Sequence, residues 1–276
     1  MTPEETKQDI RNLYARFAEA GMDQGLHTFI DSANYTFCRK RYDRSDLAIV
    51  PQTAQRLACG SGNPVALVGI KPGSAVVDLG CGGGIDIIMA ARQVEEQGKV
   101  LGIDIAPEMI EAAQQSVAES GLQPHIFFRT IDIENIYPLP KIFADVVTAN
   151  CVINLCPDRV TVFKNIFRIL KPGGILVFSD FVLSEEIDPH LRKRLQADRT
   201  GCLGRAVPAD DHLRQLTKLS FEIIEVAKSD LTAEELETIA CYPARTLHVP
   251  PSPAELLLLQ DKVAVVTIIA KRRPLN

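Results

Sequence analysis

The sequence predicts an α/β fold built on a doubly wound, mostly parallel, seven-stranded sheet, with an N-terminal helical cap and a C-terminal elaboration. Apolar runs typical of buried strands alternate with helix-like segments between residues 75 and 181. The first apolar run breaks directly into a glycine-dense turn that leads into a helix. The chain has 276 residues, 46% of them hydrophobic, which is enough for one large domain.

Residues 1–70 form the expected N-terminal cap. Thr2-Pro3-Glu4-Glu5 is a capping box with proline at the first helical position, and apolar residues at helical spacing continue until Gly21. The irregular, polar stretch from Met22 to Val50 is a candidate cover for a bound ligand. A short helix is expected from Gln52 to Cys59.

Residues 71–183 form the expected ligand-binding core, in which strands and helices alternate. The predicted strands are 75–79, 100–103, 126–131, 145–149 and 175–181, and the predicted helices are 85–94, 107–120 and 159–170. Lys171-Pro172-Gly173-Gly174 ends the last of these helices.

Residues 184–276 are expected to complete the same sheet. The pattern predicts helices at 189–199 and 210–219, a glycine-bracketed loop at 200–205, and strands at 221–226 and 263–269. The stretch between these two strands, residues 229–261, is long for a hairpin, and two further helices are expected in it, at 232–240 and 254–260. Its role stays open.

The glycine turn carries the first functional signal. Asp78-Leu79-Gly80-Cys81-Gly82-Gly83-Gly84 follows the first strand, and glycine lets backbone N–H groups and a helix N-terminus approach a ligand. The second strand ends in Asp104, an acidic residue in position to accept hydrogen bonds from ribose hydroxyls. The pattern is D-x-G-x-G-x-G, not the G-x-G-x-x-G of dinucleotide-binding proteins.

This stretch resembles the first motif of the class I S-adenosylmethionine-dependent methyltransferases, whose fold is Rossmann-like. The resemblance implies S-adenosylmethionine as the cofactor. It also implies that Ile105, Asp132 and Ile133 line the adenine and that Asn150 lies beside the methionine end. Met109 is placed to pack on the adenine, and an aspartate at position 132 can accept the exocyclic amine. The predicted cofactor-binding residues are Asp78, Gly80, Cys81, Gly82, Gly84, Asp104, Ile105, Met109, Asp132, Ile133 and Asn150.

Composition excludes several classes of partner. The net charge is -5 and the sequence pI is about 5.6, so no positive field recruits nucleic acid, and the short basic run Arg39-Lys40-Arg41 does not change this. The first residues lack a signal-peptide pattern and no apolar run reaches membrane-spanning length, so we expect a cytoplasmic protein with no membrane partner. Its seven cysteines are then expected to be reduced thiols, and none has C-x-x-C spacing.

Three of these cysteines sit where they could share a site. Cys59 precedes the first strand of the core, Cys151 follows the fourth strand, and Cys202 lies in the loop at 200–205. If they converge, they form a trigonal thiolate site suited to a soft, thiophilic ion. Cys81 and Cys156 are expected to be ordinary buried thiols, as is Cys241.

The segments around these cysteines resemble the arsenite S-adenosylmethionine methyltransferases. The resemblance rests on Asn150-Cys151-Val152-Ile153-Asn154-Leu155, on Cys59-Gly60 with Asn63-Pro64, and on Gly201-Cys202-Leu203-Gly204, and it covers residues 56–219. It implies that trivalent arsenic is the substrate, that Cys59, Cys151 and Cys202 are catalytic and hold it, and that a thiol reductant supports turnover. Two departures touch this site: Ser61-Gly62 is inserted before Asn63, and Arg205 replaces a small residue.

Two alternatives therefore stay open. In one, the cofactor site is kept, but the acceptor is a small organic thiol or another small molecule, and the cysteines are packing residues. In the other, the chain binds the cofactor or a metalloid without catalysis. An auxiliary role for Cys38, including pairing with Cys59 during turnover, also stays open.

Overall fold

The computed structural model describes residues 2–22, 40–122, 125–197, 201–241 and 252–274. Cys38 lies outside this range, so the hypothesis about its role stays a prediction. Within the range, no helix combines the length and the apolar character that crossing a membrane requires.

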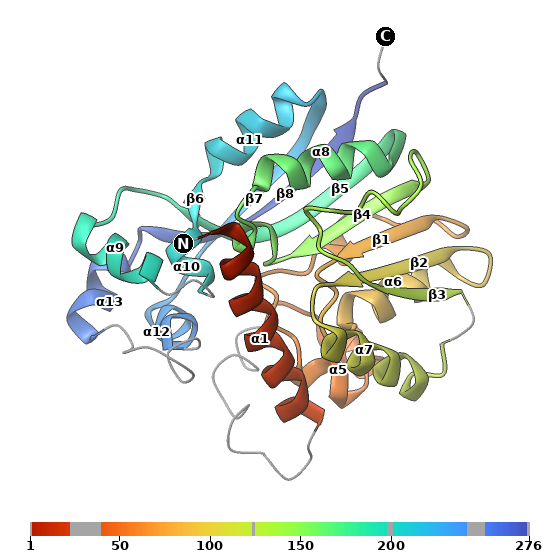
Figure 1. The fold of residues 1–276 in the computed structure, drawn as a ribbon, viewed down its shortest axis with the longest axis horizontal. Helices are drawn as coiled ribbons and strands as arrows, with labels where there is room; N and C mark the ends of the chain where they lie inside the picture. Colours follow the sequence, from red (N-terminus) through yellow and green to blue (C-terminus); the bar gives the residue numbers. More distant parts are fainter. Residues whose placement is uncertain (1, 23–39, 123–124, 198–200, 242–251, 275–276) are drawn as a thin grey trace.

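Figure 1 shows the helices and strands, most of which follow the apolar periodicity and the turn residues of the sequence. The strands are β1 Ala75–Leu79, β2 Lys99–Asp104, β3 Ile126–Thr130, β4 Ala144–Asn150, β5 Leu170–Leu183, β6 Val207–Pro208, β7 Phe221–Asp230 and β8 Val263–Arg272. The α-helices are α1 Pro3–Met22, α4 Arg44–Ala48, α5 Gln52–Arg56, α6 Ile85–Val94, α7 Pro107–Glu119, α8 Arg159–Ile169, α9 Pro189–Ala197, α10 Cys202–Arg205, α11 Ala209–Lys218, α12 Ala233–Cys241 and α13 Pro253–Leu259. Short 3₁₀ helices occupy Val65–Leu67 (η1) and Ile153–Leu155 (η2).

The strands form one sheet in the order β3-β2-β1-β4-β5-β8-β7. The pairs from β3 to β5 are parallel, whereas β8 is antiparallel to both β5 and β7. This arrangement confirms the predicted doubly wound, mostly parallel sheet with seven strands along its path. The two-residue strand β6, which pairs with β5, was not predicted because Val207–Pro208 is too short to carry a period-two pattern.

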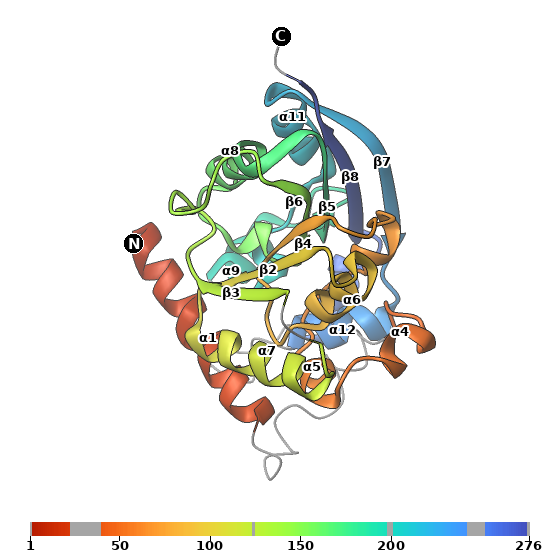
Figure 2. The same cartoon turned by 90° about the vertical axis from the view of Figure 1, so that its right-hand side faces the viewer.

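Helices cover both faces of the sheet (Figures 1 and 2). Successive residues of a strand point to opposite faces, so Val76 joins the core around α6, whereas its neighbour Val77 joins the core around α8. The aromatic rings of Phe163 in α8 and Phe178 in β5 pack together, with centroids 5.7 Å apart. Because both faces are buried, the central strands are almost continuously apolar.

Tertiary pairing extends some elements beyond the predicted bounds. β5 begins at Leu170, which pairs with Ala144, so the predicted turn at Lys171-Pro172-Gly173-Gly174 lies within the strand. β7 continues to Asp230 because it pairs with β8 as far as Ala264. Part of the predicted loop at 200–205 forms the short helix α10.

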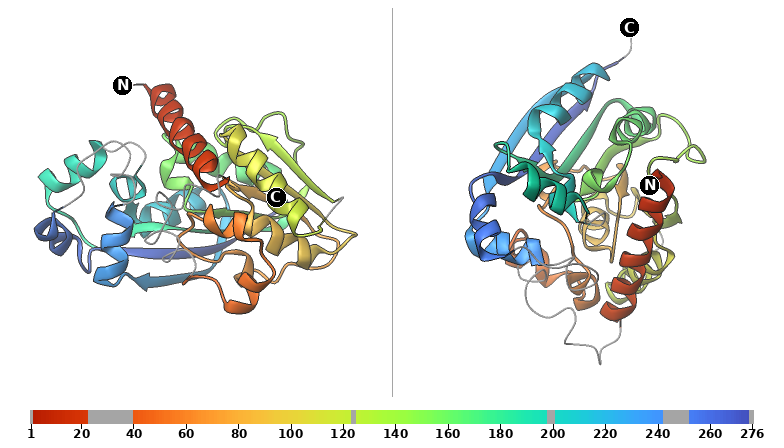
Figure 3. Two further views of the ribbon diagram at one scale, coloured as in Figure 1. Left: turned by 90° about the horizontal axis from the view of Figure 1, so that it is seen from below. Right: turned by 60° about the vertical axis from the view of Figure 1, so that its left-hand side comes forward.

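The sheet order reverses between β1 and β4, and ligands of such folds bind at the carboxyl ends of the strands beside this point. The glycine turn follows β1 there, and Cys151 follows β4. Figure 3 shows α1 lying alongside α7 rather than within the layers of the sheet. α1 thereby provides one wall of the space in front of the glycine turn.

Candidate functional site

The glycine turn adopts backbone conformations that favour glycine. Gly80, Gly82 and Gly84 have φ values of 69°, 49° and 90°, and an added Cβ at Gly80 would lie 2.6 Å from Val152. Two backbone donors of the turn are bonded to the neighbouring strand β2. The N–H groups of Gly80 and Cys81 both donate to the carbonyl of Ile103, at 2.8 and 2.9 Å. The turn therefore shapes the cleft more than it supplies hydrogen-bond donors.

Two predicted carboxylates lie at the turn in different positions. Asp104 lines the cleft and accepts hydrogen bonds from the backbone N–H groups of Gly82 and Ala106, both at 3.0 Å. Asp78 lies beneath the turn, 2% exposed, and accepts a 2.6 Å hydrogen bond from the Thr148 hydroxyl. Burial raises the pKa of both carboxyl groups. Asp104 is thus the one of the two that faces a ligand.

A third carboxylate, which the sequence analysis did not single out, lines the same cleft. Asp86, in the first turn of α6, accepts hydrogen bonds from the Tyr42 hydroxyl and the Asn150 amide, each at 3.0 Å. The Asn150 oxygen in turn accepts from the backbone N–H groups of Ser61 and Gly62, at 2.8 and 3.1 Å. The residues Ser61-Gly62 that the sequence comparison treats as inserted are therefore held by the predicted cofactor residue Asn150.

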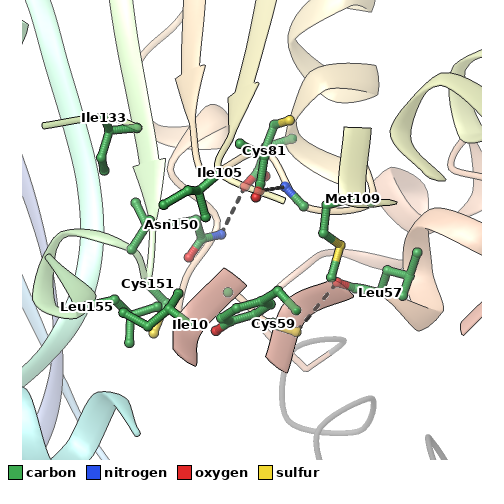
Figure 4. A pocket seen from close by; sticks show the side chains of 18 of the residues that line it. Ile10, Leu57, Cys59, Cys81, Ile105, Met109, Ile133, Asn150, Cys151 and Leu155 are labelled. Atoms are coloured by element: carbon green, nitrogen blue, oxygen red, sulfur yellow. Dashed lines mark hydrogen bonds between the residues drawn. The ribbon is translucent and has the colours of Figure 1, made fainter. Parts of the chain in front are cut away.

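The predicted adenine-binding residues all line the cleft. Ile105, Met109 and Ile133 all line it, and Met109 and Ile133 are buried (Figure 4). Asp132 lines it too, but its carboxylate forms an ion pair with Lys7 of α1 at 2.8 Å. An adenine amine would share this carboxylate with Lys7.

α1 closes the cleft with one face. Lys7, Ile10 and Tyr14 follow one another at spacings of three and four, which places them on the same side of a helix, and all three line the cleft. Figure 4 shows Ile10 on the same side of the cleft as Cys59 and Cys151, with Ile105 and Cys81 on the other side. α1 is therefore part of the site and not only a cap on the fold.

The structure brings two of the three predicted catalytic cysteines into contact. The sulfurs of Cys151 and Cys202 are 3.3 Å apart, although the residues are 51 positions apart in the chain. Cys151 has a φ of 60°, which is uncommon for a residue with a side chain, and its N–H donates to the Ser179 carbonyl at 2.7 Å. The conformation at the end of β4 thus turns the thiol toward α10.

Cys59 lines the same cleft as Cys151. Its thiol donates to the Leu57 carbonyl at 3.6 Å. Among the described residues, no three histidine, cysteine or acidic side chains are close enough to hold a metal ion together. Burial, and then negative charge on Cys202, Cys59 and Cys151, raise the pKa of Tyr14 well above its usual value. Tyr14 is therefore within electrostatic reach of all three sulfurs.

Cys81 and Cys156 are buried, as the sequence analysis expected. Burial raises the pKa of both Cys81 and Cys156 well above the usual value, so both stay neutral. Cys156 donates to the Val152 carbonyl at 3.5 Å. Arg205, which follows Cys202 in α10, is partly buried, and burial followed by the nearby Arg159 lowers its pKa.

Comparison with known proteins assigns the family. A model described as a methyltransferase domain matches residues 70–237. The chain belongs to this methyltransferase domain family. The match includes the glycine turn, Asp104, Cys151 and Cys202, and the shared domain has the class I methyltransferase fold. The side of the cleft formed by α1, Tyr42 and Cys59 precedes the matched residues.

The chain is also similar to individual proteins and solved structures. It is 34% identical over 244 residues to an arsenite methyltransferase of Halobacterium salinarum, covering 84% of this chain but 61% of the relative. It resembles the crystal structure of CrArsM, an arsenic(III) S-adenosylmethionine methyltransferase from Chlamydomonas reinhardtii, with 27% identity and a TM-score of 0.63, covering 84% of this chain and 73% of the other. The [4+2]-cyclase SpnF shares only the fold, with 22% identity, a TM-score of 0.57, and coverage of 74% of this chain and 77% of that one.

The sequence analysis missed the contributions of Lys7, Tyr14 and Asp86 to the cleft, whereas Tyr42 lies in the stretch from Met22 to Val50 that was expected to cover a ligand. For α1 a signal was present, because Lys7, Ile10 and Tyr14 share one helical face. Asp86 could have been noticed as an acidic residue directly after the glycine turn. For Tyr42 the chain offers no local pattern, since only tertiary folding brings it to Asp86.

Proposed function

We propose that this protein transfers a methyl group from S-adenosylmethionine to trivalent arsenic held by cysteine thiolates. The observation that carries the proposal is the contact between the Cys151 and Cys202 sulfurs, 3.3 Å apart, beside the cleft that the glycine turn lines. The chain spans 61% of the length of its relative from Halobacterium salinarum, so the relative's whole activity does not transfer by similarity alone.

The charge of the cleft fits this cofactor. Asp78, Asp86 and Asp104 are each less than a tenth exposed, and within the described part of the chain none of them has an ion-pair partner. Buried carboxylates without a cation are costly, and a cationic ligand relieves that cost. S-adenosylmethionine carries a sulfonium and an ammonium group, and it would supply an activated methyl group for the arsenic lone pair to take up.

In this proposal the protein's residues bind and orient the cofactor and the arsenic, and they exclude water from the site. Asp104 would hold the ribose, and Ile105, Met109 and Ile133 would pack on the adenine. Cys151 and Cys202 would bind arsenic as a preformed pair, and Cys59, on the same cleft, would provide the third sulfur. Tyr14 and Ile10 of α1 would keep water from the transferred methyl group.

The proposed chemistry requires reduced cysteines and therefore a reducing environment. No disulfide bond joins the described cysteines Cys59, Cys81, Cys151, Cys156 and Cys202 to one another. Arsenic binds thiolates, and adding a methyl group through its lone pair oxidises it formally, so a thiol reductant would be required to restore the trivalent state and the free cysteines. We therefore place the protein in the reducing cytoplasm.

The decisive experiment incubates purified protein with labelled S-adenosylmethionine, a thiol, and either arsenite or a panel of small organic acceptors. We expect label in methylated arsenic, and we expect Cys59→Ser, Cys151→Ser and Cys202→Ser to lose it while still binding S-adenosylmethionine. Cys241→Ser is the matched control, because no motif accompanies that cysteine. Label only in an organic acceptor would replace arsenic by the second function below.

A small organic thiol is the second candidate acceptor. Two features favour it: Arg205 stands beside Cys202, and the described residues hold no complete three-thiolate cluster. Binding of S-adenosylmethionine or arsenite without any methyl transfer would instead support a non-catalytic binding protein.

A further inference from the structure

Asp86 has an unusual position for an acidic residue. It is 5% exposed, lies in the first turn of α6, and lines the cleft beside Asn150. Its neighbours Tyr42 and Asn150 are uncharged, and its own negative charge helps to raise the pKa of a second carboxyl group, Asp78 of β1, after burial. A buried anion beside a second anion is a receptor for a cation.

The carboxylate also has unused hydrogen-bonding capacity. One oxygen accepts from the Tyr42 hydroxyl and the other from the Asn150 amide, which leaves further lone pairs on both. The other two buried carboxylates have different partners: Asp78 lies beneath the turn, and Asp104 accepts from the backbone N–H groups of Gly82 and Ala106. Asp86 is the carboxylate that is hydrogen-bonded to Asn150, the residue predicted to lie beside the methionine end of the cofactor.

We infer that Asp86 binds the α-ammonium group of the cofactor and thereby selects nucleosides that carry an amino-acid side arm. The inference rests on the proposed function, because it assumes that S-adenosylmethionine occupies this cleft. The Tyr42 and Asn150 hydrogen bonds hold the carboxylate in a fixed orientation, so Asp86 meets the ammonium without rearrangement.

Protonation of the Asp86 carboxylate should make ligand affinity depend on pH, which gives a second test of the inference. Burial raises the pKa of Asp86 to about 6 in the free protein. Below that pH the carboxyl group becomes neutral and loses its attraction for an ammonium group. Affinity for an ammonium-bearing nucleoside should then fall about tenfold for each further pH unit, whereas a nucleoside without the ammonium should not show this loss.

Two probes isolate the ammonium. S-adenosylhomocysteine carries it but lacks the sulfonium charge, and 5′-methylthioadenosine lacks the amino-acid arm altogether. Calorimetry of both ligands from pH 5 to 8 with wild type and Asp86→Asn should show S-adenosylhomocysteine weakened about 10- to 100-fold by the substitution, and 5′-methylthioadenosine less than threefold. The pH dependence that separates the two ligands should disappear in Asp86→Asn.

Tyr42→Phe is the matched control, because it removes a hydrogen bond to Asp86 but keeps the carboxylate. It should weaken S-adenosylhomocysteine less than Asp86→Asn does and keep the pH dependence that separates the two ligands, and thermal melting verifies that each variant is folded. If Asp86→Asn weakens both ligands equally, Asp86 only supports the fold and the inference is wrong, while the cofactor site stands. If wild type binds neither nucleoside, the proposed function fails and the inference fails with it.

Discussion

At the scale of single residues, Asp104 combines two roles that a substitution can test. Its carboxylate fastens the glycine turn through Gly82 and, in our proposal, accepts the ribose hydroxyls. We expect Asp104→Ala to weaken S-adenosylmethionine binding by about 1–3 kcal/mol, the range for a lost hydrogen bond to a charged group. Calorimetry measures this directly, and an unchanged affinity would remove the ribose assignment.

His212 offers a residue-scale test of stability away from the cleft. It is fully buried between the rings of Phe163 and Phe178, and neither ring nitrogen has a hydrogen-bond partner. Burial lowers its pKa to about 4, so the folded protein keeps it neutral while the unfolded chain protonates it near pH 6.5. Its contribution to stability is therefore complete above pH 6.5 and is lost as the pH falls toward 4.

Between pH 7 and pH 4 the free energy of unfolding should fall by about 3 kcal/mol less in His212→Phe than in wild type, because the variant has no imidazole to protonate in the unfolded chain. Denaturant unfolding of both proteins at the two pH values gives the comparison. An equal acid-induced loss in wild type and variant would show that His212 does not titrate as described.

At the scale of elements, α1 is fastened to the core by a small cluster of charges. Lys7 forms ion pairs with Asp132 at 2.8 Å and Glu134 at 2.6 Å, and its side chain is 20% exposed. Burial opposes its charged form, but hydrogen bonds to the two carboxylates outweigh burial and raise the pKa of Lys7. The cluster joins the wall of the cleft to the end of β3.

We expect Lys7→Met to increase hydrogen exchange in α1 several-fold and Lys7→Arg, which keeps the charge, to change it far less. Exchange followed by mass spectrometry on peptides from residues 3–22 provides the measurement. Equal exchange in wild type and Lys7→Met would mean that packing against α7 alone holds the helix.

An element could be predicted well where interactions between residues close in the sequence determine it. Residues 85–94 were predicted as a helix and form α6 with those bounds, because glycine precedes an apolar, helix-favouring run. α10 was expected to be a loop, because four residues carry no helical period. The early start of β5 depends on pairing between Leu170 and Ala144, which no local pattern encodes.

At the scale of the whole molecule, the chain alone predicted the site's ingredients but not their assembly. The glycine turn, Asp104 and the three cysteines stand out by residue type and spacing. The 3.3 Å contact between Cys151 and Cys202, and the arrival of Tyr14 near both, depend on long-range folding. For the same reason Asp86 became visible as a candidate only when Tyr42 and Asn150 were found around it.

The distribution of charge over the molecule leads us to a last prediction, which concerns nucleic-acid binding. The described part of the basic run is engaged in holding the chain together: Arg41 pairs with Glu235 of α12 at 3.0 Å and donates to the Ser229 hydroxyl at 3.2 Å, and Lys40 pairs with Glu234 at 3.5 Å. With a net charge of -5, no surplus positive field is available for phosphates.

We therefore expect no measurable binding to a 30-base-pair DNA or RNA duplex at physiological ionic strength. Fluorescence anisotropy over a salt series is the measurement, with Arg41→Ala as the comparison. This variant should lower the free energy of unfolding by about 1 kcal/mol through loss of the pair with Glu235, yet leave the anisotropy unchanged. Binding that weakens with added salt and is lost in Arg41→Ala would show that the basic run contacts nucleic acid after all.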